Sequence, residues 1–348
     1  MGFAPDSIRG WGHVRADTPC RSTRRALILA AAAWPALAWA GAALGQSKKP
    51  PVLIGWLSWG SRALSARNLA ALKEGMAALG WKEGSNYLLE ERWADGQVER
   101  LPALAEELAL RRPVLIVAAP TQTARAAAKA APRTPIVVIG GDPVSARLVA
   151  SYARPGGMVT GLSTALTEIT EKYLELLLAA APKVQRVGFL FDRNGASVDS
   201  FKENMRRSVA QHSVEAQYAE VAGLAEIEPA LSRLAKEGVQ ALVVMPGVSV
   251  ATERRRILKF ALAQRWPVVA GGAAWTEEGA LLGYTADMPA IHRRAAYFVD
   301  RIQKGAKPAD LPLEWPTKFV LVINMKTARA LKLEIPRDLA AREDRVIE

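Results

Sequence analysis

The chain has 348 residues, a formal net charge of +12 at pH 7 and a single cysteine. This length is enough for two domains of ordinary size. The basic residues are scattered along the chain and form no dense block with interleaved aromatics, which favours a solvated basic surface over a nucleic-acid groove.

Residues 1–46 have the features of an export signal. A Thr-Arg-Arg sequence at residues 23–25 opens an almost uncharged run up to Gly45, and a polar stretch follows at residues 46–50. A basic start, an apolar stretch and small residues at its end are typical of a cleaved secretory signal peptide. An uncleaved membrane anchor stays open as the alternative, because about twenty apolar residues can span a bilayer. The arginine pair suits ordinary secretion or the twin-arginine route. Either way, we expect the protein to work in the periplasm.

The remaining 302 residues contain no cysteine, because Cys20 precedes the apolar run. This excludes disulfides, thiolate metal sites, cysteine nucleophiles and a lipid anchor after cleavage. His212 and His292 are 80 residues apart and lack metal-ligand spacing. No glycine-rich nucleotide-binding motif follows a strand. We therefore expect no metal and no cofactor.

The first half of the mature chain alternates short apolar runs with amphipathic segments. Apolar side chains recur at three- and four-residue spacing from Leu69 to Leu79, with Gly80 as a helix C-cap, and again from Leu101 to Leu108. A short helix is expected over 123–131. Strands are expected at 52–57, 87–93, 114–118 and 136–139. Strands that are apolar at every position and are separated by helices indicate a parallel sheet covered on both faces.

A glycine-rich stretch at 154–161 has little helix or strand propensity and is expected to be a crossover, and the alternation then restarts. Helices are expected at 168–181, 198–211, 227–237, 252–264 and 290–304, and strands at 187–191, 215–221, 241–245, 268–270, 281–284 and 319–323. The prediction is an α/β protein with two Rossmann-like lobes, each a parallel sheet flanked by helices. Lobe 1 comprises residues 52–162 plus about 286–314, and lobe 2 comprises 163–285 plus about 315–348. Three crossings between the lobes would form a hinge beside a cleft.

Small polar or glycine-rich loops recur at the carboxyl ends of the predicted strands, where open parallel sheets bind ligands. Each loop leads into a helix N-terminus, which favours an anionic group. The candidate ligand-binding residues are Ser58, Trp59, Ser61, Thr121, Asp142, Asn194, Gly247, Ser249, Gly272 and Trp275. The four hydroxyl residues and Asp142 could instead cap helices, and the two tryptophans could instead cover apolar surface or line a contact between the lobes. Trp56 is expected in the core, and Asp287 in a structural role at the hinge.

Catalysis is not expected. The sequence Gly-Val-Ser-Val-Ala at 247–251 approaches a nucleophile elbow, but it ends in alanine. His292 lies on a predicted helix beside two arginines, and no histidine occupies a credible partner position.

Several collinear segments resemble the ABC-transporter substrate-binding proteins of the tryptophan/tyrosine-binding type, which have the type I periplasmic-binding-protein fold. The segments are Glu-Arg-Trp-Ala-Asp-Gly at 91–96, Gly-Asp-Pro-Val at 141–144, the stretch 153–163, Gly-Ala-Lys-Pro-Ala-Asp-Leu-Pro at 305–312, and 316–324. Trp59 and the sequence Ala-Ala-Trp at 273–275 depart from the commoner pattern.

The resemblance implies binding without catalysis. Two lobes would close on a small ligand, and the closed protein would dock on a membrane permease with its ATPase. We expect a monomer, and a ligand that is an amino acid or a related small carboxylate with an apolar or aromatic part. A ligand-sensing module for a chemoreceptor or histidine kinase has the same fold and stays open as the alternative.

Overall fold

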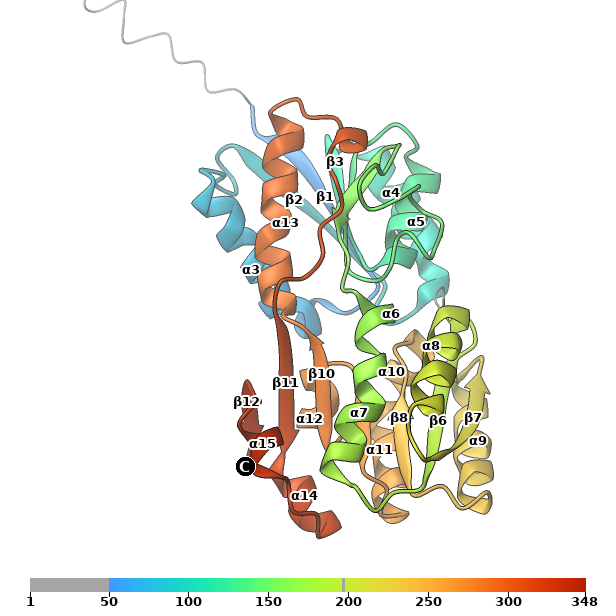
Figure 1. The fold of residues 1–348 in the computed structure, drawn as a ribbon. Coiled ribbons are helices and arrows are strands. Elements are labelled where there is room, and N and C mark those ends of the chain that lie inside the picture. Colours follow the sequence, from blue (N-terminus) through green and yellow to red (C-terminus); the bar gives the residue numbers. More distant parts are fainter. Residues whose placement is uncertain (1–49, 196–197) are drawn as a thin grey trace, which may run out of the picture. The chain divides into compact units, whose positions relative to one another are not determined.

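The structure is a computed structural model that describes residues 50–195 and 198–348 (Figure 1). The predicted leader lies outside this part of the chain. Residues 51–348 form one compact unit. None of the helices in the described part has the length and apolar character needed to cross a membrane.

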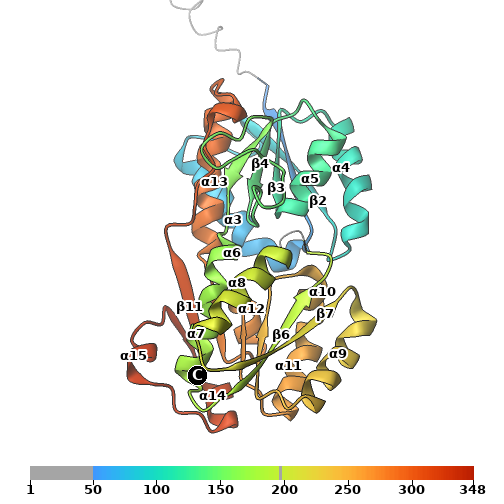
Figure 2. The same ribbon diagram turned by 45° about the vertical axis from the view of Figure 1, so that its right-hand side comes forward.

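Lobe 1 is built on a five-stranded parallel sheet with the order β2-β1-β3-β4-β5. Its strands are β1 (Val52–Ser58), β2 (Tyr87–Trp93), β3 (Leu115–Ala119), β4 (Ile136–Ile139) and β5 (Val159–Leu162). Helices α3 (Arg62–Ala78) and α13 (Met288–Gln303) cover one face, and α4 (Leu101–Leu110) and α5 (Thr121–Ala130) cover the other. Figures 1 and 2 show the two helix pairs on opposite sides of the sheet.

Alternate residues of these strands supply two separate cores, because successive side chains of a strand point to opposite faces. Trp56 and Val117 pack toward α3 and α13, whereas Leu57 and Ile116 pack toward α4 and α5. Trp56 is only 1% exposed, which confirms the expectation that it belongs to the core.

Lobe 2 is built on a seven-stranded sheet with the order β12-β11-β10-β9-β8-β6-β7. Its strands are β6 (Arg186–Asp192), β7 (Glu215–Val221), β8 (Ala241–Val244), β9 (Val268–Ala270), β10 (Leu282–Ala286), β11 (Phe319–Asn324) and β12 (Arg345–Ile347). The pairing of β10 with β11 is antiparallel, and the other pairings described in this sheet are parallel.

Four longer helices cover the lobe 2 sheet. They are α7 (Glu171–Ala180) and α8 (Val198–Ala210) on one face, and α9 (Leu224–Lys236) and α11 (Arg254–Ala263) on the other. Shorter helices are α6 (Leu166–Ile169), α10 (Val248–Thr252), α12 (Ala273–Glu277), α14 (Met325–Leu331) and α15 (Arg337–Ala340), and the 3₁₀ turns are η1 (Val98–Arg100) and η2 (Pro308–Asp310).

The crossover predicted at 154–161 is in part a strand, because β5 begins at Val159 and pairs in parallel with β4. Gly161 has a φ of 135°, and a Cβ atom there would lie 2.2 Å from the carbonyl oxygen of Val138. The glycine therefore permits the close approach of the two strands. The glycine-rich composition that suggested a crossover belongs in part to a strand.

One predicted helix is interrupted: the segment expected from residue 168 is divided at Thr170 between α6 and α7. The helix expected at 252–264 corresponds to α11, which begins two residues later because the short helix α10 ends at Thr252. Helix α5 begins two residues earlier than expected, directly after Pro120.

The chain passes between the two lobes three times, at residues 163–165, 287 and 314–318; we call these segments the hinge. Two of them are joined, because the Ser163 N–H donates to the Glu314 carbonyl over 3.0 Å. At the third, the Asp287 carboxylate accepts the Ala290 N–H (3.1 Å) and caps α13. The structural role expected for Asp287 is confirmed.

Candidate ligand-binding site

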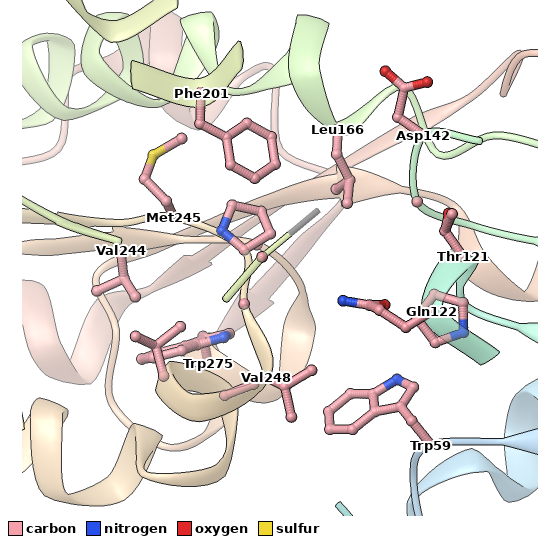
Figure 3. A pocket seen from close by; sticks show the side chains of 18 residues that line it. Trp59, Thr121, Gln122, Asp142, Leu166, Phe201, Val244, Met245, Val248 and Trp275 are labelled. Atoms are coloured by element: carbon pink, nitrogen blue, oxygen red, sulfur yellow. The ribbon is translucent and has the colours of Figure 1, made fainter. Parts of the chain in front are cut away.

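A cavity of about 230 Å³ lies where the carboxyl ends of strands from both sheets meet. Loops that follow β1, β3 and β4 line it from lobe 1, and loops that follow β6, β8 and β9 line it from lobe 2. These are the six loops in which the sequence analysis placed its candidates. Figure 3 shows Trp59 and Gln122 extending from one side, with Trp275, Val248 and Phe201 on the other.

The lobe 1 wall is formed by Trp59, Pro120, Thr121, Gln122, Gly141 and Asp142. Trp59 is half-buried and packs against the core under α4 and α5. Thr121 and Gln122 begin α5, whose N-terminus has no side-chain cap. The Thr121 hydroxyl instead donates to the Gly140 carbonyl (3.0 Å).

Gly141 is required for the close packing of this wall. Its φ is +75°, and a Cβ atom would lie 2.1 Å from the Thr121 Oγ1. Its N–H donates to the hydroxyl of Thr164, which belongs to the hinge (2.9 Å). A glycine therefore lets the β4 loop, the start of α5 and the hinge meet at one point.

Asp142 is 4% exposed, and its carboxylate is held by its own loop. Oδ1 accepts the N–H groups of Val144 (3.1 Å) and Ser145 (3.0 Å) and the Tyr152 hydroxyl (3.0 Å), and Oδ2 accepts the Ser145 hydroxyl. Burial raises the pKa of Tyr152, so this hydroxyl remains a donor. Figure 3 shows the carboxylate turned away from Trp59 and Trp275.

The lobe 2 wall is predominantly apolar. Phe201 and Met245 belong to the core under α7 and α8, whereas Val244, Val250 and Trp275 belong to the core under α9 and α11. Leu166, Pro246, Val248 and Ala251 complete the apolar lining. This wall is the end of two packed cores, so packing fixes the positions of its side chains.

Trp275 is 7% exposed and lies on the short helix α12. The Thr276 carbonyl accepts the Asn324 side-chain N–H (2.7 Å), which ties the helix to β11. Glu278, at its C-cap, pairs with Arg254 at 2.6 Å and with Arg255 at 3.2 Å. These contacts hold the indole against the core while part of its surface lines the cavity.

A second buried carboxylate, Asp192, supports the lobe 2 loops and was missed in the sequence analysis. It ends β6, and it accepts the backbone N–H of Asn194 (3.0 Å) and of Ser249 (2.7 Å). A Cβ atom on Gly247 would lie 2.2 Å from the Asp192 Cβ. The run of apolar residues before Asp192 and the glycine at 247 were the available signals, but their contact required the fold.

Five of the ten candidate residues line the cavity: Trp59, Thr121, Asp142, Gly247 and Trp275. The other five lie nearby but outside the lining, and local bonds or conformations occupy most of them. Ser58 accepts the Gly60 N–H (3.3 Å), and Ser61 caps α3 by accepting the Leu64 N–H (3.3 Å). The Asn194 side chain donates to the Ala222 carbonyl (2.8 Å).

Ser249 and Gly272 are set by backbone geometry. The Ser249 N–H is bound by Asp192, and Gly272 precedes α12 with a φ of 98°.

Of the lining residues that were missed, Phe201, Met245 and Leu166 look like ordinary core residues in the sequence. Gln122 and Val248 fall inside loops that had been singled out.

The cavity wall carries little charge for so basic a protein. Asp142 is the one charged side chain among the described residues that line it. Glu168, on α6 two residues after the lining residue Leu166, has a pKa raised by burial and, to a lesser degree, by the negative charge of Asp142. Within the described residues, no group of acidic, histidine or cysteine side chains could hold a metal ion.

His292 lies outside the cavity, in the core of lobe 1. It is 2% exposed, its ring lies 6.0 Å from the Trp56 ring, and its Nδ1 is 2.8 Å from the Met288 carbonyl oxygen. Burial lowers its pKa to about 4. The imidazole is thus a neutral packing group.

Comparison with known proteins identifies a matching family and proteins of similar fold. The family described as ABC transporter substrate binding protein matches residues 64–347. A tyrosine-binding protein of Clostridioides difficile strain R20291 is 24% identical over 256 residues, and the match covers 73% of each chain.

Two solved structures have closely similar folds. A conserved domain protein of Vibrio cholerae O1 biovar eltor superposes with a TM-score of 0.78 at 26% identity, over 85% of this chain and 99% of that one. An ABC domain of Streptococcus pneumoniae in complex with L-Trp superposes with a TM-score of 0.79 at 23% identity, over 85% of this chain and all of that one. The predicted type I periplasmic-binding-protein fold is confirmed.

Proposed function

This chain belongs to the family of ABC transporter substrate-binding proteins, and from that premise we propose that its cavity binds an amino acid with an apolar or aromatic side chain. In this proposal the two lobes close on the ligand, and the protein delivers it to a membrane permease with its ATPase.

The observation that carries the proposal is the composition of the cavity. Its volume of about 230 Å³ is below the roughly 300–1,000 Å³ typical of pockets for drug-sized molecules, so it suits a ligand of amino-acid size. Trp59 lines it from lobe 1, and Trp275 lines it from lobe 2 among aliphatic side chains. Such a surface favours a ring or a branched apolar group.

The polar groups of the ligand would face lobe 1. The first backbone N–H groups of α5 lie at the cavity wall beside Thr121 and Gln122 and lack a side-chain cap. A helix N-terminus favours a carboxylate. Asp142, an acidic residue, is the one charged side chain among the described residues that line the cavity, and it favours an amine over a second carboxylate, so a zwitterion fits better than a simple acid.

The ligands of the relatives support the same class. One relative is a tyrosine-binding protein, and one solved structure of this fold contains L-Trp. Both ligands combine an aromatic ring with a charged amine and carboxylate. The sequence identities are 24% and 23%, so the individual amino acid is left to experiment.

A thermal-shift panel tests the proposal. The purified protein is unfolded and refolded to remove any carried-over ligand, and is then screened with amino acids, small carboxylates, polyols and the amine-free and carboxylate-free analogues of each hit. A ligand at a hundred times its dissociation constant stabilises by about 2.7 kcal/mol, a shift of several degrees. We expect hits among apolar and aromatic amino acids and none among their truncated analogues. A folded protein with no amino-acid hit would contradict the proposal.

Import and export have their own tests. Deletion of the gene should abolish uptake of the radiolabelled ligand; unchanged uptake with lost chemotaxis toward that ligand would favour the sensing alternative.

The mass of the periplasmic protein should correspond to the loss of about the first 46 residues, through cleavage of the predicted signal peptide. A full-length mass would favour the membrane anchor.

A further inference from the structure

The Tyr152 hydroxyl lies between two acceptors in different parts of the molecule. It is 3.0 Å from the Asp142 Oδ1 and 3.3 Å from the Ser163 Oγ. The Ser163 hydroxyl donates its own proton to the Gly141 carbonyl (2.9 Å), so its Oγ is an acceptor toward Tyr152. A phenol has a single proton, and only one of the two acceptors receives it at a time.

One acceptor belongs to the cavity wall, and the other belongs to the hinge. Asp142 lines the cavity, whereas Ser163 is the first residue of the segment that leaves lobe 1 after β5. The Asp142 carboxylate is charged and therefore the stronger acceptor. In this structure the shorter of the two contacts is the one to Asp142.

Tyr152 also contacts the hinge segment at 314–318. Its ring lies 4.5 Å from the ring of Trp315, and its carbonyl accepts the N–H of Leu313, the residue just before that segment (2.8 Å). The Arg294 side chain of α13 binds the Glu314 carboxylate with two bonds of 2.8 and 2.7 Å. Two of the three hinge segments thus converge on Tyr152 and are anchored to lobe 1 there.

We propose that Tyr152 is a positioning residue that couples the cavity wall to the hinge by sharing its hydroxyl proton between Asp142 and Ser163. This inference rests on the proposed function, since it assigns a regulator to the same cavity. A rotation of the hinge moves Ser163 and Trp315 relative to Tyr152 and changes how firmly the hydroxyl holds Asp142. By reciprocity, a ligand that fixes the Asp142 loop restrains the hinge.

Two substitutions separate this role from simple support of Asp142. Tyr152→Phe removes the bond that reaches both the carboxylate and the hinge. Ser145→Ala is the matched control, because the exposed Ser145 hydroxyl also donates to Asp142, and no contact of its side chain with the hinge is found in the described residues. A role limited to orienting Asp142 would give both variants the same behaviour.

The readout is the distance between the lobes in the ligand-free protein. Fluorophores are attached to cysteines introduced as Leu110→Cys and Leu262→Cys, in a Cys20→Ser background of the full chain. These leucines lie on α4 and α11 and are 81% and 51% exposed. Single-molecule energy transfer then reports the distribution of interlobe distances, and titration with the best ligand of the panel reports the dissociation constant.

Tyr152→Phe should broaden the ligand-free distribution and raise the dissociation constant by up to about tenfold, because the Asp142 loop is no longer held in place before the ligand binds. Ser145→Ala should leave the distribution as in the wild type. A Tyr152→Phe distribution identical to the wild type, or an equal broadening in Ser145→Ala, would overturn the proposal. If the wild type binds none of the ligands, the proposed function fails, and the ligand-free distributions alone still decide whether Tyr152 restrains the hinge.

Discussion

The wall that lobe 1 contributes to the cavity is held by hydrogen bonds, whereas the wall from lobe 2 is the end of two packed cores. Thr121 is fixed by a bond to the loop after β4, and Asp142 is fixed by bonds within that loop. Both walls need a glycine at a close contact, Gly141 and Gly247. Phe201 and Trp275 are fixed by burial. A hydrogen bond can be exchanged for another during hinge motion with a small change in free energy, whereas opening a packed core requires a much larger one. Adjustment to the ligand is therefore expected in lobe 1 and rigid recognition in lobe 2.

Trp275→Ala should give the largest effect and tests the packed wall. Removal of an indole that is 7% exposed should lower the free energy of unfolding by about 3–5 kcal/mol, because it leaves a cavity in the core. Ligand binding should be lost as well. Urea unfolding followed by circular dichroism measures the first effect, and calorimetric titration of the folded variant measures the second. A stability loss below that of a surface substitution would mean that lobe 2 does not hold this wall by packing.

Acid pH should weaken lobe 1 selectively, because its core contains the buried His292. Burial lowers the His292 pKa from 6.5 to about 4, so the unfolded chain binds the proton more readily than the native protein does. Stability is complete above about pH 6.5 and falls as the pH is lowered toward 4, by about 3 kcal/mol in total. Hydrogen exchange at pH 7 and 4.5 should show this loss in lobe 1, since the half-buried His212 of lobe 2 is not enclosed in a core.

The control for this prediction is His292→Gln, whose side chain does not titrate. Its stability should change less than that of the wild type between pH 7 and 4.5. An equal loss in both proteins would assign the pH dependence to other groups.

Trp59→Ala should separate binding from stability in the lobe 1 wall. The side chain is half-buried, so the stability loss should be smaller than for Trp275, while ligand binding should weaken by about 1–3 kcal/mol if the indole contacts the ligand. Calorimetric titration measures the change. Trp81→Ala is the matched control, since Trp81 is a half-buried tryptophan of lobe 1 that bonds to Asp300 (3.1 Å) and lies outside the cavity. Equal affinities of the two variants would exclude a ligand contact for Trp59.

Ser61→Ala should give the smallest effect and tests whether this candidate is a helix cap. Its hydroxyl accepts the Leu64 N–H, so its loss should cost about 1 kcal/mol of stability. The dissociation constant should not change, because Ser61 does not line the cavity. A weakened ligand affinity at unchanged stability would mean that Ser61 contributes to ligand binding and not to capping of the helix.

The framework could be predicted because buried parallel strands leave a continuous apolar signal. The runs at 136–139 and 268–270 became β4 and β9 with the expected bounds. The strand β5 was missed because Gly161 serves a backbone contact with Val138, which only the neighbouring strand explains. Short helices such as α12 depend on anchors far away in the chain, for example Asn324, and have little local signal.

The loops of the site could be located, but the roles of their side chains could not. Topology places every loop after a parallel strand at the same edge of the sheet. Whether a polar side chain faces the cavity or its own backbone depends on local geometry, as the bonds of Ser61 and Asn194 show. The apolar lining residues Phe201 and Met245 look like core residues in the sequence, because they are members of the core as well.

Calorimetric titration of the refolded protein with L-tryptophan and L-tyrosine is the most direct test of the cavity as an amino-acid site. We predict binding of at least one of them, or of another apolar amino acid from the panel, at one site per chain and with a negative heat-capacity change from burial of the apolar group. Absence of binding by every such amino acid, in protein shown to be folded, would contradict it.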